Sequence, residues 1–308
     1  MSLGLIINVK DDADLLIRNI DYHESVGVDY FLVSERGSSA AELEKINDFA
    51  SQRPNVVVFK QNIADMVLDS PEFIRLRIIL FEKYHATFTS NWVAVIDTDE
   101  FLLPVSSSIL HAGILKTANL VALPRYNVAL PRAGVDAFYE KLASPELLLQ
   151  QEIIVKPITL SPEKMREEPD IPWVMHRVGP KVMTSIKSVS DIAPGFHDLV
   201  SDTAVVRGCP HDLLILHLPF SSNERFARKV ANMNAHLENV GHTLKQGEAW
   251  HWRRWVAELI DEESIRLEFE KQFFADTDLL KLRQEEVVMT AECFFHTLVN
   301  QQPGCALL

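Results

Sequence analysis

Three carboxylates, Asp97, Asp99 and Glu100, lie within four residues of one another in the stretch NWVAVIDTDEFLLP. The apolar run 93–96 before them predicts a buried strand, so the carboxylates stand at the end of that strand. Two carboxylates that are two residues apart in an extended turn can converge on one hard cation. Such a cation neutralises the charge that builds on a departing diphosphate. The alternative is that the triplet only ends a strand and caps a turn, which is a costly use of carboxylates beside a buried strand.

The composition is that of a folded, acidic protein. The chain has 308 residues, of which 47% are hydrophobic and 24% charged, with a net charge of −13. This length allows one large core or two modest ones. A general nucleic-acid binder is excluded, because phosphate neutralisation needs a basic face. The three cysteines (Cys209, Cys293 and Cys305) are odd in number and lack metal-type spacing, which indicates a reducing compartment and no disulfide framework.

The sequence contains no apolar run of the about eighteen residues that a membrane span needs. The first residues, MSLGLIINVKDDADLL, lack the basic and long apolar regions of a signal peptide and predict a strand that begins almost at once. We therefore expect a soluble, cytoplasmic protein without a transmembrane segment. Peripheral contact with the inner face of a membrane remains open to such a protein.

Strands and helices alternate in the first third of the chain. Strands are predicted at 3–9, 29–34, 55–60 and 92–97, and helices at 11–27, 38–52 and 70–85. This alternation predicts an α/β fold with a doubly wound, mostly parallel, Rossmann-like sheet. The short, all-apolar strands indicate that the sheet is covered on both faces. Ligands of such sheets bind beyond the carboxyl ends of the strands, where Asp97 and Asp99 lie.

The pattern loosens after residue 104. We predict a helix at 106–118 and strands within 119–132, 180–189 and 213–220, followed by a mainly helical remainder. Two regions follow from this pattern. Residues 1–220 are predicted to form the domain that binds at the strand ends, and residues 221–308 a helical C-terminal extension packed on it.

Three segments together resemble a known family. VKDDADLLIRNIDYHESVGVDYFLV, then WVAVIDTDEFLLP, then ILHLPFSSNERFARKV are similar to the bacterial glycosyltransferase family 2-like proteins, the group related to family 92. The similarity touches residues 3–35, 61–104 and 176–255, more than half of the chain. It departs from the family at Lys10-Asp11-Asp12, where the family has Lys-Asn-Glu, and at VSERGSSA, where the family has an Asp-containing turn. These departures concern the contacts to the nucleotide base more than the fold.

The resemblance implies a GT-A fold and a metal-dependent glycosyltransferase, of hexosyltransferase type and inverting. Its donor would be a nucleotide-diphosphate sugar, with a UDP-sugar favoured. Mn²⁺ or Mg²⁺ would be held by Asp97 and Asp99. The acceptor would be a hydroxyl of a glycan or a lipid-linked glycan, in the synthesis of a surface glycan or polysaccharide. The helical C-terminal part would shape the acceptor site or lie against a partner or a membrane.

A third metal ligand is predicted among the later histidines. His197 follows Gly195 and Phe196, where the resembling proteins have a Gly-Asn-His-like turn. In GT-A enzymes a late histidine often completes the metal shell, and neutral imidazole suits manganese. His217, inside the apolar run LLILHLPF, is the competing ligand, although a buried strand histidine also explains it.

Five residues are predicted to bind the donor. Lys10 follows the first strand, and Glu35 ends the second, where the family places a carboxylate near the base or ribose. Arg75 lies in a largely apolar helix and either pairs with a buried acid or reaches the diphosphate with its fork of donors. Lys181 and Lys229 are predicted to meet the leaving diphosphate. For Lys10 the alternative is an ordinary surface lysine.

The base that removes the acceptor proton is assigned to Asp198, with Asp170 behind it. His23 shares a helical stripe with Leu16 and Ile20, which favours a core histidine over a ligand. The stretch WHWRRW at 250–255 forms either a wall for a sugar or diphosphate, or the start of an amphipathic helix.

Two other functions fit parts of the sequence. The stretch VAVIDTDEF also resembles the Asp-x-Asp loop of haloacid-dehalogenase-type phosphatases. In those enzymes the first Asp is the nucleophile and lies on the first strand, whereas three strands are predicted before Asp97. A non-catalytic protein that binds a nucleotide sugar is the second alternative, because fold alone does not establish activity.

Overall fold

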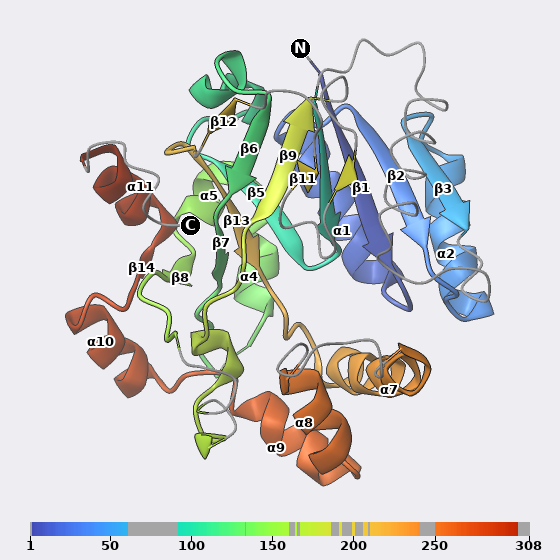
Figure 1. Cartoon of the computed structure of the whole chain (residues 1–308), viewed down its shortest axis with the longest axis vertical. Helices are drawn as coiled ribbons and strands as arrows, with labels where there is room; N and C mark the ends of the chain where they lie inside the picture. The colour runs from blue at the N-terminus through green and yellow to red at the C-terminus, as the bar shows by residue number, and fades with distance from the viewer. Residues whose placement is uncertain are drawn as a thin grey trace.

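The computed structural model describes residues 2–60, 92–132, 134–159, 164, 167–185, 191–192, 199–200, 206–208, 210–240 and 250–300. Its centre is a seven-stranded sheet in the order β12-β6-β9-β4-β1-β2-β3 (Figure 1). The strands of this sheet, in that order, are Arg207–Gly208, Leu120–Leu123, Lys181–Ser185, Trp92–Asp97, Leu3–Val9, Tyr30–Glu35 and Val56–Lys60. Strand β9 is antiparallel to both of its neighbours, and the other neighbouring strands are parallel. The predicted α/β class with a mostly parallel sheet is confirmed.

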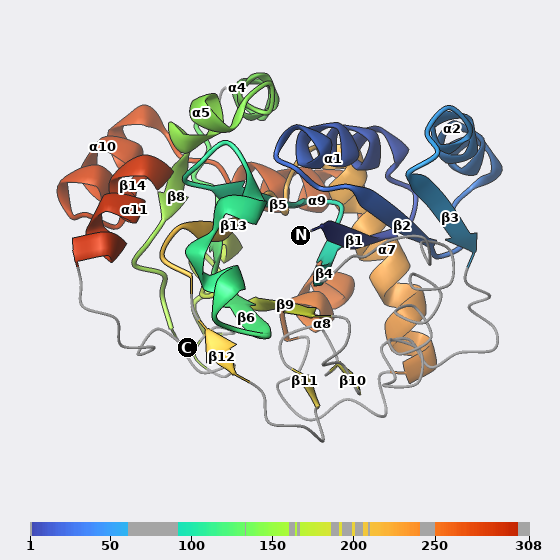
Figure 2. The same cartoon turned by 90° about the horizontal axis from the view of Figure 1, so that it is seen from above.

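Helices α1 (Ala13–Ser25) and α2 (Ala40–Ser51) connect the first three strands. Figure 2 shows both helices on the same side of β1, β2 and β3. Helix α1 ends where Gly27 takes a φ of 91°, a left-handed conformation that glycine adopts without steric cost. Strand β1 is buried along its whole length, as expected for a strand that is covered on both faces.

A second sheet continues directly from the first. Strand β4 ends at Asp97, and β5 (Glu100–Pro104) begins after only two residues. β5 pairs antiparallel with β13 (Leu213–His217), which pairs parallel with β7 (Arg125–Asn127). In this register His217 lies opposite both Glu100 and Asn127. The acidic triplet therefore lies at the junction of two sheets.

The remaining elements are short before residue 222 and mainly helical after it. The first group is η2 (Ile109–His111), η3 (Gly113–Lys116), α4 (Asp136–Lys141), α5 (Pro145–Leu149), β8 (Glu152–Ile154), η4 (Trp173–Met175), β10 (Asp191–Ile192) and β11 (Leu199–Val200). The second group is α7 (Asn223–Val240), α8 (Trp250–Glu258), α9 (Glu262–Glu270), α10 (Asp276–Gln284), β14 (Val288–Thr290) and α11 (Ala291–Asn300). The predicted helical C-terminal region is thus present.

Two predicted helices have other outcomes. The helix expected at 106–118 is instead two short 3-10 helices, η2 and η3. They are separated at Ala112, whose ψ of 122° is extended and interrupts helical hydrogen bonding. The helix expected at 70–85 lies outside the described residues.

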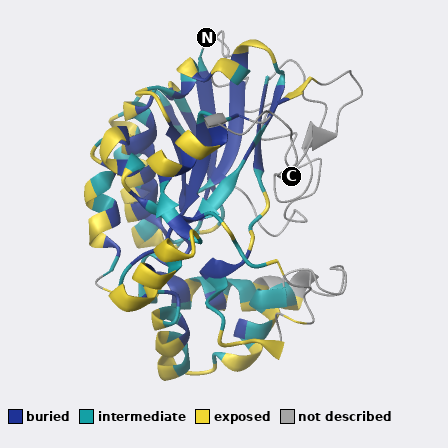
Figure 3. Cartoon of the chain, turned by 90° about the vertical axis from the view of Figure 1, so that its left-hand side faces the viewer, coloured by how far each residue is buried: buried dark blue, intermediate teal, exposed yellow. Residues whose placement is uncertain are grey.

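The C-terminal elements pack on the rest of the chain in two places. Helix α11 places Phe294, Phe295 and Leu298 in the main core beside the sheets. Helices α7 and α8 bury Phe226 and Trp255 in a second core. Figure 3 shows buried sheet strands above and C-terminal helices with both buried and exposed faces below. The predicted boundary at residue 220 stays a prediction.

Within the described ranges, every helix is too short or too polar to span a lipid bilayer.

Candidate functional site

The order of the central sheet places a switch point between β1 and β4. On one side of β1 the sheet continues to β2 and β3. On the other side of β1 lies β4, followed across the sheet by β9, β6 and β12. Ligands of open α/β sheets bind in the crevice at the carboxyl ends of such a strand pair. The residues that follow these two ends are Lys10, Asp11 and Asp12 after β1, and Thr98 and Asp99 after β4. Helix α7 lies just beyond these ends in Figure 1.

Asp97 is the half-exposed carboxylate of the site. Its side chain is 45% exposed, and Oδ2 accepts a hydrogen bond of 3.0 Å from Nζ of the buried Lys181. Asn8 on β1 also approaches it, with 3.4 Å between Nδ2 and Oδ1. Loss of hydration opposes ionisation, but the Lys181 ammonium outweighs it and holds the pKa of Asp97 below its usual range. Asp97 is therefore ionised at neutral pH.

Glu100 is a structural carboxylate beneath the loop. It is fully buried, pairs with Arg125, and lies 3.5 Å from Nζ of Lys181. One of its oxygens also accepts a hydrogen bond of 2.9 Å from the backbone N–H of Asp97. Burial raises the pKa of Glu100, and the two cations only partly offset this. Glu100 therefore stabilises the turn after β4 through its hydrogen bond with the backbone of Asp97.

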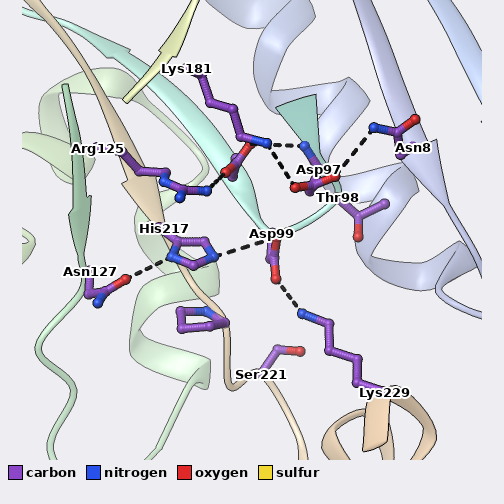
Figure 4. Close-up of polar contacts among 12 residues, drawn as sticks. Asn8, Asp97, Thr98, Asp99, Arg125, Asn127, Lys181, His217, Ser221 and Lys229 are labelled. Atoms are coloured by element: carbon purple, nitrogen blue, oxygen red, sulfur yellow. Dashed lines mark hydrogen bonds and ion pairs between the residues drawn. The ribbon is translucent and has the colours of Figure 1, made fainter. Parts of the chain in front are cut away.

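Asp99 has two faces with different partners (Figure 4). Oδ2 lies 2.5 Å from Nζ of Lys229, as Figure 4 shows. The same oxygen lies 3.2 Å from Nη2 of Arg225. Oδ1 faces Nε2 of His217 at 3.9 Å. The side chain is only 4% exposed. Burial opposes its charge, but Lys229 and Arg225 hold the pKa of Asp99 well below its usual range.

Arg225, near the start of α7, links the loops that follow β1 and β4. Its Nε donates to Oδ2 of Asp12 at 2.6 Å, and its Nη2 lies 3.3 Å from Oγ1 of Thr98. Thr98 in turn donates to Oδ2 of Asp12 at 2.7 Å. Asp12 stands at the N-cap position of α1, yet its side chain forms no cap hydrogen bond. Its carboxylate instead forms a buried ion pair with Arg225 and accepts a hydrogen bond from Thr98 at the switch point.

The tautomer of His217 follows from its neighbour Asn127. The Asn127 amide nitrogen donates to the carbonyls of Val174 (2.7 Å) and His176 (3.3 Å). Its oxygen, 2.7 Å from Nδ1 of His217, must then be an acceptor, so Nδ1 bears the proton. Burial lowers the pKa of His217 well below its usual range, although Asp99 opposes this shift. Neutral His217 therefore presents the lone pair of Nε2 towards Asp99.

These donors fit a divalent cation that takes the rest of its ligands from a substrate. Among the residues that the structure describes, no group of three His, Cys, Asp or Glu side chains suited to a metal occurs. Asp99 and His217 do provide one oxygen and one nitrogen donor that face each other. Ions such as Mg²⁺ are commonly bound by one or two carboxylates and completed by phosphates and water. The residues present are compatible with such an ion.

The structure brings together four of the predicted site residues. Asp97 ends β4 and Asp99 lies in the turn that follows it, and Lys181 and Lys229 each pair with one of them. Lys10 lies half-buried directly after β1.

Glu35 is nearby, at the end of β2, but its role in the fold is local. It is 3% exposed, and its Oε1 accepts a hydrogen bond from the backbone N–H of Ser38. It therefore caps the turn that follows β2. A contact with the nucleotide base or ribose stays a prediction.

Three further predictions, Arg75, His197 and Asp198, lie outside the described residues. Asp170 is exposed. The carbonyl of the preceding Pro169 accepts hydrogen bonds from Arg254 and Lys271 of the C-terminal helices.

His23 is a core residue. It is completely buried, its Nδ1 contacts the carbonyl oxygen of Asn19 at 2.8 Å, and its Nε2 accepts from the backbone N–H of Leu102 at 3.0 Å. Burial lowers the pKa of His23 to about 3. Both ring nitrogens are thus used within the fold, and the interpretation as a core histidine is confirmed.

Sequence reasoning missed Arg225 and Asn127. Arg225 precedes Lys229 by four residues, the spacing that places two side chains on one helix face. That spacing is a signal that could have found it. Asn127 has no comparable signal, because it reaches His217 only through the pairing of β7 with β13.

No protein-family model and no curated protein matches the chain. Among solved structures, glucosyl-3-phosphoglycerate synthase from Mycobacterium tuberculosis with Mn²⁺, UDP and phosphoglyceric acid is 15% identical. That match covers 63% of this chain and 60% of the other, with a TM-score of 0.31. The same enzyme with Mg²⁺ and UDP gives 15% identity, the same coverage and a TM-score of 0.32. A structure described as a mycobacterial protein is 16% identical over 63% of this chain and 57% of its own, with a TM-score of 0.31.

The chain thus spans about 60% of the length of the synthase chains that it resembles. A likeness with so low a TM-score defines neither the fold nor the activity of this chain. Membership of the family 2-like, family 92-related group stays a prediction.

Proposed function

We propose that this protein is a metal-dependent glycosyltransferase of GT-A type that uses a nucleotide-diphosphate sugar, with a UDP-sugar as the favoured donor. The observation that supports it most is the position of Asp97 and Asp99. Both carboxylates lie at the carboxyl end of β4, at the switch point of the sheet, and chain cations surround both. A site with this charge arrangement suits a cation and the phosphates bound to it.

The residues take separate roles in this proposal. Asp99 and His217 would hold Mn²⁺ or Mg²⁺, with His197 as the alternative nitrogen ligand, and Asp97 would join them only if its side chain turns away from Lys181. When bound, the ion would supply positive charge that stabilises the leaving diphosphate. Lys181 would keep Asp97 ionised. Lys10, Arg75 and Lys229 would contact the donor.

The transfer requires a group that takes the proton of the acceptor hydroxyl. We propose Asp198 for this role in an inverting hexosyl transfer, with Asp170 as the second choice. The acceptor would be a glycan or a lipid-linked glycan.

Calorimetric titration of UDP and GDP, each with and without Mn²⁺, tests the donor site. The natural protein should bind one nucleotide only when Mn²⁺ is present. Asp99→Asn should lose this Mn²⁺-dependent nucleotide binding, because an amide oxygen is a far weaker metal ligand than a carboxylate. Failure of the folded natural protein to bind either nucleotide would contradict the proposal.

Two alternatives give different outcomes. A phosphatase would release inorganic phosphate from a phosphomonoester in a reaction that depends on Asp97. Asp97, however, ends β4, and three other described strands precede it in the chain. A non-catalytic binding protein would bind the nucleotide with Mn²⁺ but neither transfer nor hydrolyse the sugar of any donor offered.

A further inference from the structure

Asp99, one of the carboxylates proposed to bind the metal, is already neutralised by cations of the chain itself. Nζ of Lys229 lies 2.5 Å from its Oδ2, and Nη2 of Arg225 lies 3.2 Å from the same oxygen. The other oxygen, Oδ1, faces Nε2 of His217. A divalent ion at Oδ1 would therefore share this carboxylate with Lys229.

The two cations on Asp99 are held very differently. The Arg225 side chain is 6% exposed and also bonds Asp12 and Thr98. The Lys229 side chain is 29% exposed. Within the described residues it forms a salt bridge with Asp99. Lysine has a compact charge on a flexible four-carbon stem. Lys229 is therefore less constrained at Asp99 than Arg225 is.

A divalent ion and the Lys229 ammonium oppose each other on one carboxylate. Asp99 is 4% exposed, so water and salt screen the repulsion between two cations there only weakly. Lys229 lies on α7, which stands beyond the carboxyl ends of β1 and β4 (Figure 1). An ammonium that turns away from Asp99 thus remains at the edge where a diphosphate is proposed to bind.

We propose that Lys229 is a tethered cation that exchanges with the divalent ion at Asp99. It neutralises Asp99 when no ion is bound, and it moves to the diphosphate of the donor when the ion binds. This inference rests on the proposed function and adds a coupling to it. The divalent ion should raise the affinity for the diphosphate, because it releases Lys229 to contact the phosphates. The diphosphate should raise the affinity for the ion by the same factor, because a coupling free energy between two sites is reciprocal.

The variant Lys229→Met tests the exchange, because it keeps most of the stem and removes the charge. In calorimetric titration with Mn²⁺ alone, it should bind the ion roughly tenfold more tightly than the natural protein, a typical coupling between sites. With Mn²⁺ at saturation, the same variant should bind UDP roughly tenfold more weakly. One substitution thus changes the two affinities in opposite directions, which a general disturbance of the site does not do.

Two further variants are controls. Lys229→Arg keeps the charge and should not bind Mn²⁺ more tightly. Lys45→Met removes a lysine of α2 whose side chain is 47% exposed and pairs with Asp14 and Glu42. It should change neither affinity. If Lys229→Met does not fold, as judged by circular dichroism, Lys229→Gln is measured instead, with the same expectation.

The outcomes separate this inference from the proposed function. Unchanged or weaker Mn²⁺ binding in the folded neutral variant overturns the exchange. Mn²⁺-dependent binding of UDP to the natural protein would then still support the proposed function. A natural protein that binds neither Mn²⁺ nor UDP overturns both.

Discussion

Nε2 of His217 and Oδ1 of Asp99 face each other at 3.9 Å, a separation too long for a hydrogen bond. The Asn127 side chain fixes the proton of His217 on Nδ1, so both facing atoms present lone pairs. Two acceptor atoms that face each other repel, and a cation bound between them would turn this repulsion into two attractive contacts. This relationship makes His217 a candidate metal ligand, whereas His197, the other predicted histidine ligand, lies outside the described residues.

Replacement of Asn127 by leucine should weaken metal binding without removing a ligand. Groups that orient a metal-binding histidine typically contribute 10–100-fold to affinity, so we expect a loss of about tenfold for Mn²⁺. Calorimetric titration measures this loss. Asn234→Leu on α7, where the natural side chain bonds Glu238 on an exposed face, is the control. Equal Mn²⁺ affinity in the Asn127 variant and the natural protein would show that His217 is not a ligand.

Arg225→Met should destabilise the fold strongly. The substitution leaves the buried carboxylates of Asp12 and Asp99 without the cation that links them. Removal of one partner from a buried ion pair typically costs about 3–5 kcal/mol. Urea denaturation measures the free energy of unfolding.

Arg266→Met is the matched control for this substitution. The Arg266 side chain is 44% exposed and pairs with Glu263 and Glu270, so we expect a much smaller loss of stability than for Arg225→Met. Similar losses in both variants would contradict the role assigned to Arg225.

The buried His23 should make stability depend on pH. Its pKa is lowered to about 3 in the folded protein, from an ordinary value near 6.5 in the unfolded chain. Below about pH 6.5 the unfolded state binds a proton that the folded state refuses, so stability is lost as the pH falls towards 3. This one group should contribute a slope of about 1.4 kcal/mol per pH unit in that window.

Urea denaturation at pH 7, 6, 5 and 4 tests this slope in His23→Gln. The variant should be less stable at pH 7 but should lose stability less steeply below it. His111→Gln replaces an exposed histidine and should leave the slope unchanged. Parallel curves for the natural protein and the His23 variant would show that His23 does not titrate as assigned.

Glu35 can be assigned to the turn or to the nucleotide by two substitutions. Glu35→Ala leaves the backbone N–H of Ser38 without its acceptor, which should cost about 1 kcal/mol in unfolding free energy. Glu35→Gln keeps an acceptor oxygen and should cost less. If Glu35 only caps the turn, both variants bind UDP with natural affinity in the presence of Mn²⁺. A matched loss of UDP affinity in both would instead support the predicted nucleotide contact.

Local patterns predict the elements that form the sheet and the place of the site. The apolar run before Asp97 forms β4 as expected, and the carboxylates lie at its carboxyl end. Sequence reasoning names His217 only as the competitor of His197, because its approach to Asp99 depends on the pairing of β13 with β5 across more than a hundred residues. The predicted helix at 106–118 was wrong, since Ala112 adopts an extended ψ that propensity does not reveal.

The two-residue link between β4 and β5 also limits which insertions and deletions the protein can tolerate. Thr98 and Asp99 are the only residues between a strand of one sheet and a strand of the other. Because side chains alternate along a strand, one inserted residue would turn every side chain of β5 to the opposite face or break its pairing with β13. Insertions and deletions should therefore be absent from this loop in homologous chains, even where neighbouring surface loops vary in length.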